Sequence, residues 1–208
     1  MARNTGPVCR MCRREQAKLF LKGEKCFTNC TLDRRPTPPG VARPQRGKPS
    51  EYQIRLREKQ KLRRMTMMTE RPFARMMEKA AKTPGKTAES LMRSLETRLD
   101  SVVRRLGFAT SLAAARQLVL HGSIRLNGRG INIPSHHVKV GDVVSLNPKL
   151  KDNAAIKLSL EFAEKKATRP AFLEFKAEDL SGKLLREPSR EEASFPVNDQ
   201  LVVEYYSR

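Results

Sequence analysis

The sequence is poor in the residues that build large cores. It has no Trp, 5% aromatic residues and 38% hydrophobic residues among 208 positions. A chain of this length suits one large or two small domains, and this composition predicts small cores. No apolar run approaches the roughly 20 residues that span a bilayer. A membrane-spanning protein is therefore not expected.

The sequence also lacks the signals of an enzyme or a secreted protein. Its three histidines, His121, His136 and His137, are not accompanied by a carboxylate pair, a nucleophile motif or a Gly-rich phosphate loop. The lone Gly128-Arg129-Gly130 is typical of a turn. The first residues contain no apolar signal region, so a cytosolic location is expected. We predict that the chain is not an enzyme and has no small-molecule substrate.

Acidic residues are scarce. Only 22 Asp and Glu face 42 Lys and Arg, which gives a net charge of +20. Residues 1–75 alone hold 20 basic and 6 acidic residues. Self-repulsion of this size opposes compact folding unless a polyanion neutralises it. Nucleic acid is the natural candidate, because each phosphate contact releases condensed counterions.

All four cysteines lie in one short N-terminal segment, as Cys9-x2-Cys12-x13-Cys26-x3-Cys30. Two close pairs joined by a short loop are typical of a closed tetrahedral zinc site, which is structural rather than catalytic. Two disulfides would need an oxidising compartment that nothing in the sequence indicates, and an iron–sulfur cluster is a further alternative. We expect one structural zinc ion (Zn2+) per chain.

A basic, proline-rich stretch follows the cysteines. Residues 31–49 contain five prolines and two glycines, which exclude regular structure. An extended strap on RNA and a flexible linker explain this composition equally well. Ser50 and Gln53 then give the capping-box signal of a helix that is basic on most sides. Such a helix gains little from packing on protein alone, so phosphate contact explains it best.

Hydrophobic periodicity predicts three further helices in the middle of the chain. One begins near Thr69, a single long helix runs from Thr87 to Gly107, and another lies between Ser111 or Thr110 and Gly122. The apolar positions of the first are Phe73, Met76, Met77, Ala80 and Ala81.

Strand signals dominate the rest of the chain. Asn127-Gly128 favours a tight hairpin turn between residues 124–126 and 131–133. The apolar tail, residues 201–206, has β propensity. The remaining expected elements are a turn and strand in 138–146, a helix in 153–165, and strands in 172–175 and 182–185.

Residues 97–146 contain a series of short motifs: Arg98-Leu99-Asp100, Arg104-Arg105-Leu106-Gly107-Phe108-Ala109, Ala115-Arg116-Gln117-Leu118-Val119, His121-Gly122, Ile124, Asn127-Gly128 and Gly141-Asp142. Together these motifs resemble a known RNA-binding module, the one named after the fourth protein of the small ribosomal subunit. The resemblance implies that two helices and the following loop pack against folded RNA. The alternative is a small helical domain with solvated arginines.

The same module is attached to several RNA-modifying enzymes and tRNA synthetases. The rest of the chain must therefore indicate which family the protein resembles. The cysteine pairs, the basic strap, Tyr52, the run 56–61 and the ending 201–207 resemble the bacterial family of fourth small-subunit ribosomal proteins, in its zinc-containing form.

The family resemblance implies a structural constituent of the small subunit that binds the 5′ domain of its ribosomal RNA and nucleates assembly of the subunit body. It also implies contact with the neighbouring fifth small-subunit protein, a contribution to decoding accuracy, and a position near the mRNA entry channel. The alternative is a zinc-containing, nucleic-acid-binding regulator of translation or transcription.

We therefore expect an α+β protein in three parts. Residues 1–45 form the zinc-bound segment and basic strap. Residues 46–96 form a helical domain joined by the tail 188–208, and residues 97–187 form the RNA-binding module with antiparallel strands. The predicted RNA-binding residues are Arg3, Arg43, Arg46, Lys48, Arg55, Arg57, Lys59, Lys61, Arg63, Arg98, Arg104, Arg105, Arg116, Gln117 and His121.

Overall fold

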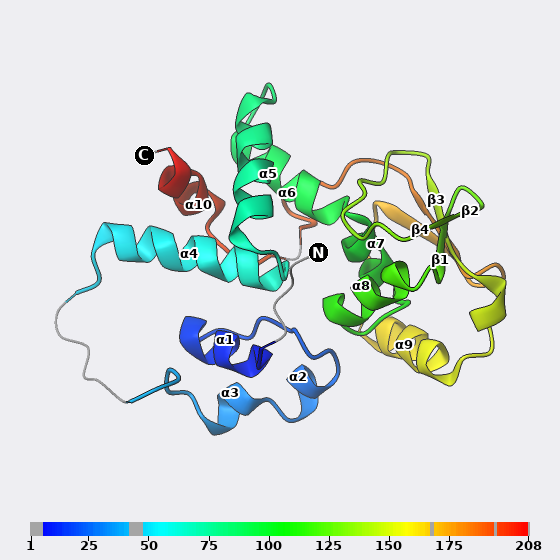
Figure 1. Ribbon diagram of the computed structural model, residues 1–208, viewed down its shortest axis with the longest axis horizontal. Helices are drawn as coiled ribbons and strands as arrows, with labels where there is room; N and C mark the ends of the chain where they lie inside the picture. The colour runs from blue at the N-terminus through cyan, green and yellow to red at the C-terminus, as the bar shows by residue number, and fades with distance from the viewer. Residues whose placement is uncertain (1–5, 42–47, 167–168, 194, 208) are drawn as a thin grey trace. The chain divides into compact units, whose positions relative to one another are not determined.

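The computed structural model describes residues 6–41, 48–166, 169–193 and 195–207, and it divides into two compact units (Figure 1). The first unit combines the described residues up to Leu91 with those after Ser194, and the second runs from Met92 to Ala193. Within the described ranges, no helix is both long and apolar enough to cross a membrane. The architecture is α+β, with a helical first unit and an antiparallel sheet in the second.

Helices form the first unit. Helix α4 begins where the capping signal predicts, because the Ser50 hydroxyl accepts a hydrogen bond from the Gln53 amide at 3.3 Å. Helix α5 follows Thr69 as expected, but Ala81 is exposed, so its buried face is narrower than the periodicity indicates. The helices described in this unit are α1 (Val8–Glu15), α2 (Lys25–Thr28), α3 (Thr31–Arg34), α4 (Glu51–Met65), α5 (Glu70–Lys82) and α10 (Asp199–Tyr206).

The C-terminal tail is helical despite its β propensity. Residues Asp199–Tyr206 form α10, which packs along α4 (Figure 1). The Asn198 side chain caps it by accepting a hydrogen bond from the Leu201 amide at 3.4 Å. Val202 is fully buried, and the Tyr205 ring lies 5.8 Å from that of Tyr52 on α4. Packing and a polar cap therefore override the local β propensity of this segment.

The expected long helix from Thr87 to Gly107 is two helices, α6 (Thr87–Glu96) and α7 (Leu99–Leu106). The chain is extended at Arg98, which pairs with His137 in an antiparallel bridge. The Leu99 amide donates to the His136 carbonyl, and the Val138 amide donates to the Thr97 carbonyl, both at 2.8 Å. These bonds to a distant segment replace the helical bonds at the break, and sequence periodicity cannot show them.

Five antiparallel strands form the sheet of the second unit, in the order β2-β1-β3-β5-β4. Asn127 and Gly128 have positive φ angles of 50° and 79°, as a tight hairpin turn requires. The return strand starts at Arg129, two residues earlier than predicted, because the loop holds only these two residues. The strands are β1 (Ile124–Leu126), β2 (Arg129–Ile131), β3 (Val143–Leu146), β4 (Leu173–Lys176) and β5 (Ser181–Leu184).

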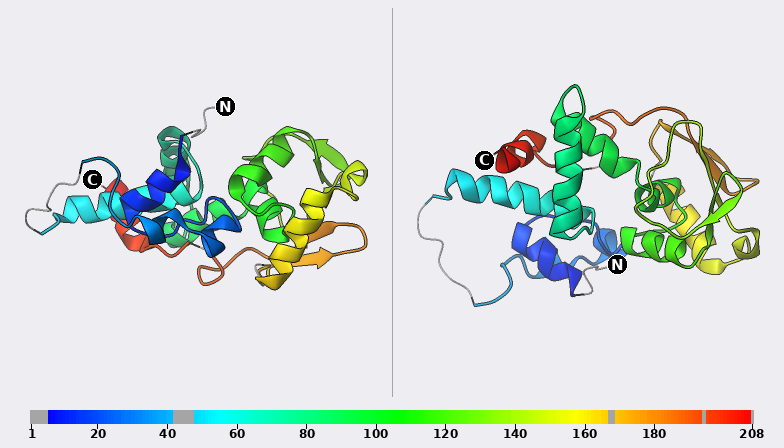
Figure 2. Two further views of the ribbon diagram at one scale, coloured as in Figure 1. Left: turned by 90° about the horizontal axis from the view of Figure 1, so that it is seen from below. Right: turned by 45° about the horizontal axis from the view of Figure 1, so that its top comes forward.

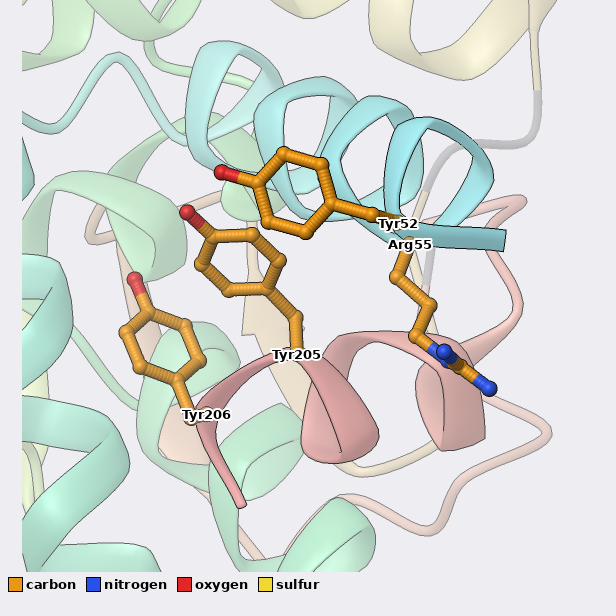
Figure 3. Close-up of a pocket in the computed structure, with 4 residues that line it drawn as sticks. All are labelled: Tyr52, Arg55, Tyr205 and Tyr206. Carbon is orange, nitrogen blue, oxygen red and sulfur yellow. The ribbon is translucent and has the colours of Figure 1, made fainter. Parts of the chain in front are cut away.

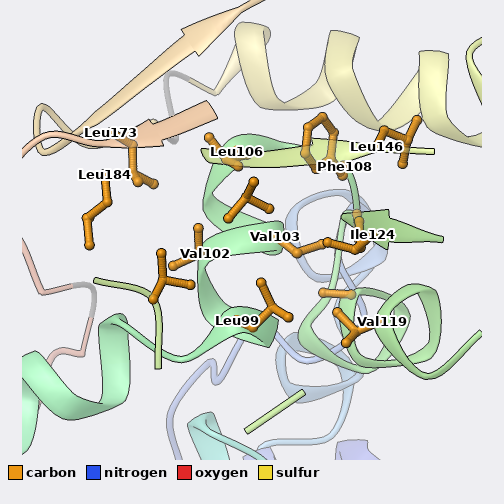
Figure 4. Close-up of a cluster of buried hydrophobic side chains, with 14 of the residues drawn as sticks. Leu99, Val102, Val103, Leu106, Phe108, Val119, Ile124, Leu146, Leu173 and Leu184 are labelled. Atoms are coloured by element: carbon orange, nitrogen blue, oxygen red, sulfur yellow. The ribbon is translucent and has the colours of Figure 1, made fainter. Parts of the chain in front are cut away.

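Helix α7 lies at the centre of the second unit's core (Figure 4). Its side chains face the inner side of the sheet, where Ile124, Leu146 and Leu184 point towards them. Helices α8 (Leu112–Leu120) and α9 (Ala154–Lys165) complete the unit, with the short 3₁₀ helix η1 (Pro148–Leu150) between the sheet and α9. Helix α9 is the yellow helix of the second unit in Figure 2. It lies close to the end of α7, because a Cβ atom at position 107 would be 2.6 Å from Cβ of Ala163.

Gly182 allows α7 to approach the sheet closely. A Cβ atom at this position would lie 2.1 Å from Cδ2 of Leu106, which is itself fully buried. The added methyl of Gly182→Ala should therefore strain the core and lower the free energy of unfolding by about 1–3 kcal/mol. Gly130→Ala is the matched control in the same sheet, because nothing lies within 4 Å of its Cβ position. Urea unfolding of the two full-length variants should separate them clearly; equal losses would contradict the close approach.

Candidate nucleic-acid interface

Four of the predicted RNA-binding residues belong to the N-terminal segment and the strap. Arg3, Arg43 and Arg46 lie outside the described residues. Lys48 is exposed just before α4. In the described part of the proline-rich stretch, the Thr37 and Pro38 carbonyls accept hydrogen bonds from the Arg13 side chain, at 2.8 and 3.3 Å.

The basic side chains of α4 meet acidic groups of their own unit. Arg57 and Arg64 both contact the carboxylate of Glu15 on α1, and that carboxylate is 2% exposed. Burial raises the pKa of Glu15 and lowers that of Arg64, while the attraction between the two charges acts against both shifts. The sequence had indicated that α4 could gain little from protein alone. That interpretation is wrong, because the partners come from distant helices.

The remaining predicted residues of α4 are bound in the same way. Lys59 is 3% exposed, and its ammonium donates to Glu70 at 2.8 Å and lies 4.5 Å from the centre of the Tyr205 ring. The other pairs are Arg55 with Glu204 at 2.7 Å and Glu51 at 2.9 Å, Lys61 with Glu58 at 3.0 Å, and Arg63 with Gln60 at 2.8 Å and Glu70 at 3.4 Å.

A pocket of about 340 Å³ opens between α4 and α10 (Figure 3). Tyr52, Tyr205 and Tyr206 line it with their rings side by side, and Arg55 lies at the edge. Burial, and then the hydrogen bond that its hydroxyl donates to Glu70 at 2.8 Å, raise the pKa of Tyr206. The three tyrosine rings therefore pack between the two helices.

In the second unit, Arg98 lies inside the fold, although it is one of the predicted RNA-binding residues. Its side chain donates two hydrogen bonds to Asp100, with Nε 3.0 Å from Oδ1 and Nη2 2.7 Å from Oδ2. The two side chains are 6% and 2% exposed. Arg98 precedes α7, because the helix breaks at this residue, and its guanidinium is turned towards the carboxylate of the first turn.

Two further arginines of this unit pair with buried acids. Arg116 on α8 donates to Oδ2 of Asp100 at 3.3 Å. Arg105 donates to both oxygens of Glu96, at 3.1 and 2.6 Å, and the Glu96 side chain is 1% exposed. Burial, followed by the neighbouring charge of Arg105, lowers the pKa of Arg104 to about 10, against the attraction of Glu96 and Asp100. The second unit thus gathers four guanidinium groups around two carboxylates.

Gln117 and His121 are the predicted residues that lie fully on the surface of this unit. Gln117 is exposed on α8, and His121 is the residue at which that helix ends. With Arg116, whose side chain is 15% exposed, they supply polar groups to the surface of α8, where Ala113 and Leu120 are also exposed. Such polar groups suit phosphate oxygens and 2′-hydroxyls of folded RNA.

Sequence reasoning missed the acids that organise these arginines. Asp100 stands in one of the quoted motifs, so its position was visible but its partners were not. Glu15 and Glu96 carry no sequence signal, because their partners lie 42 and 9 residues away at Arg57 and Arg105. A polar clamp between two loops was also missed: Asn127 donates to Asp142 at 2.8 Å.

All four cysteines have free thiols, with Cys12 and Cys26 buried. Burial raises the pKa of Cys12, and the charges of the other three cysteines contribute to this rise. The Lys22 amide donates to Sγ of Cys26 at 3.3 Å. Among the residues that the structure describes, no three or more His, Cys, Asp or Glu side chains are arranged as ligands of a metal ion.

Comparison with known proteins also divides the chain into two parts, close to the boundary between the two compact units. Residues 3–96 match the family model described as "Ribosomal protein S4/S9 N-terminal domain", and residues 97–144 match that of the S4 domain. The chain is 51% identical to small ribosomal subunit protein uS4A of Symbiobacterium thermophilum, 52% to uS4 of Dictyoglomus turgidum and 48% to uS4 of Thermus thermophilus. Each alignment covers 100% of both chains. The chain belongs to the uS4 family.

Membership of the uS4 family decides between the classes that the sequence left open. The family consists of ribosomal structural proteins, which confirms the prediction that the chain is not an enzyme. Its S4 domain is an RNA-binding domain, and the four arginines described above lie at or within its matched range, with Glu96 directly before it. A ribosomal, RNA-binding role replaces the alternative of a transcriptional or translational regulator.

Proposed function

We propose that this chain is a primary ribosomal RNA-binding protein of the small subunit, which binds the 5′ domain of the RNA and nucleates assembly of the subunit body. The observation that carries the proposal is the similarity of about 50% identity to uS4 proteins over the full length of both chains. The net charge of +20 supports it, because RNA phosphates can neutralise the positive charge that the protein's own acidic residues do not balance. The site of action is the ribosome in the cytoplasm.

The outer face of α8 is the part of the S4 domain that we assign to RNA contact. Arg116 and Gln117 supply donors for phosphate oxygens and 2′-hydroxyls, and His121 adds a polar group at the helix end. Arg104, which is close enough to Arg105, Glu96 and Asp100 to feel their charges, adds positive charge to the same unit. Arg98 and Arg105 contribute by holding their carboxylate partners in place, since both are occupied by bidentate bonds.

The other proposed contacts rest on the family resemblance of the N-terminal segment and the tail. They are the neighbouring fifth small-subunit protein and mRNA near the entry channel, with an influence on decoding accuracy. Exposed Lys48 and the strap before it supply the positive charge that a nearby RNA strand would need.

We also propose that Cys9, Cys12, Cys26 and Cys30 hold one structural zinc ion (Zn2+). The pair spacing supports it, as does the backbone amide of Lys22 that donates a hydrogen bond to Sγ of Cys26. Zinc would supply the cross-link that α1 and the short helices after it need, because they have little apolar core of their own. Within the described residues no three of these side chains are arranged around a common centre, so the proposal rests on the residue types and their spacing.

Binding to RNA can be tested at an exposed glutamine. Gln117→Glu places a negative charge on the proposed RNA face of α8 without disturbing a buried contact. It should weaken binding to 5′-domain ribosomal RNA by about tenfold, from lost hydrogen bonding and added repulsion. Gln200→Glu makes the same change on an exposed position of α10 and should alter affinity less than about twofold. Filter binding at several salt concentrations measures both.

Two outcomes would contradict the RNA-binding proposal. Equal weakening by both variants would show that net charge, and not the α8 face, sets the affinity. Displacement of the wild-type protein from 5′-domain RNA by duplex DNA, at equal concentration and salt, would show that it is not a ribosomal RNA-binding protein of this kind.

The zinc proposal predicts about one zinc per chain in protein purified without chelator, because a closed thiolate site binds a single ion. Metal analysis by mass spectrometry measures it. Cys26→Ser should lose the metal, whereas His121→Ala, at an exposed histidine, should keep it. Iron in place of zinc, or two disulfides by thiol counting under denaturing conditions, would contradict the proposal.

A further inference from the structure

Asp100 occupies an unusual position for an acidic residue in an RNA-binding unit. Its carboxylate lies in the first turn of α7, is 2% exposed and accepts hydrogen bonds from three residues. Arg98 donates two of them, the Ser101 amide donates one at 3.0 Å, and Arg116 donates one at 3.3 Å. The carboxylate therefore connects the segment before α7, the helix itself and α8.

The two arginines on Asp100 differ in what they can do. Arg98 is buried at 6% exposure and uses its planar fork fully on the carboxylate, so it neutralises Asp100 by itself. Arg116 brings a second positive charge to an acid that is already paired, and it reaches further towards the surface, at 15% exposure. It also neighbours exposed Gln117 on the outer face of α8.

The surroundings leave this region with excess positive charge. Glu96 is occupied by Arg105, and Arg104 lies beside that pair. Burial, with the charge of Arg105, depresses the pKa of Arg104 to about 10. Four guanidinium groups stand against two carboxylates, so phosphate is the ligand class that completes the charge balance.

We infer that Asp100 is a positioning residue for RNA recognition: its carboxylate fixes the Arg116 guanidinium on α8 in the orientation that meets a backbone phosphate. This inference rests on the proposed RNA-binding function and deepens it. A long arginine side chain loses rotamer freedom when it is immobilised, and that loss opposes binding. Because Asp100 immobilises Arg116 when the protein folds, the side-chain entropy of Arg116 is lost on folding and not on RNA binding.

The inference can be tested by whether one substitution strengthens or weakens RNA binding. Asp100→Asn removes a negative charge near RNA, so electrostatics alone predicts tighter binding. Positioning predicts weaker binding, by roughly tenfold, because Arg116 loses its charged partner. It also predicts that the salt dependence falls by about one phosphate contact. Glu174→Gln removes the same charge from an exposed residue on β4 and should leave affinity unchanged or slightly higher.

A double-mutant cycle separates positioning from a general loss of structure. Arg116→Gln should weaken binding to 5′-domain RNA about tenfold in the wild type, and less than about twofold when Asp100→Asn is already present. Additive losses, or tighter binding by Asp100→Asn, overturn the inference. Circular dichroism of each full-length variant checks its folding.

If Asp100→Asn does not fold, Arg116→Lys in the wild type decides the same question, because it keeps the charge and removes the fork. Positioning predicts a loss close to that of Arg116→Gln, and retained wild-type affinity overturns it. The outcomes also distinguish the two proposals. A wild-type protein that does not bind 5′-domain RNA contradicts the proposed function, whereas normal binding that is weakened by Arg116→Gln but not by Asp100→Asn contradicts positioning alone.

Discussion

Ion pairs between arginines and three buried carboxylates hold together a chain of net charge +20. The carboxylates are Glu15 in the first unit and Glu96 and Asp100 in the second, each with a side chain no more than 2% exposed. Burying a charge is costly, and removing one member of such a pair typically costs about 3–5 kcal/mol. Removing one of these acids would therefore leave arginine charges unpaired inside the unit and destabilise the contacts between the segments that carry them.

This use of the acids connects folding to RNA binding. The chain has 20 more basic than acidic groups, and several of its acidic side chains are buried in ion pairs inside the units. The outer faces are left positive, and the arginines nearest to them are already ordered by their carboxylate partners. RNA then meets a surface that needs little reorganisation, which favours affinity because side-chain ordering is otherwise lost on binding. The same interactions that let a basic chain fold thus prepare it for a polyanion.

Local chemistry was enough to predict the elements that depend on local chemistry. Ser50 marks the start of α4, and Asn127-Gly128 marks the hairpin, because a cap and a positive-φ turn are properties of a few adjacent residues. The helical tail at 199–206 and the break at Arg98 were missed, because both depend on contacts with distant segments. The RNA face was predicted only in part for the same reason. The sequence shows where the arginines are, but it does not show which of them pair with acidic residues in the fold.

Nuclear magnetic resonance of the guanidinium groups in the free protein tests the role of the buried acids most directly. The account predicts that Arg98, Arg105 and Arg116 give separate, slowly rotating Nη signals in the absence of RNA, because each is held by a carboxylate. Exposed Arg129 on the hairpin serves as the freely rotating reference. Averaged signals from Arg98, Arg105 and Arg116, indistinguishable from those of Arg129, would contradict it.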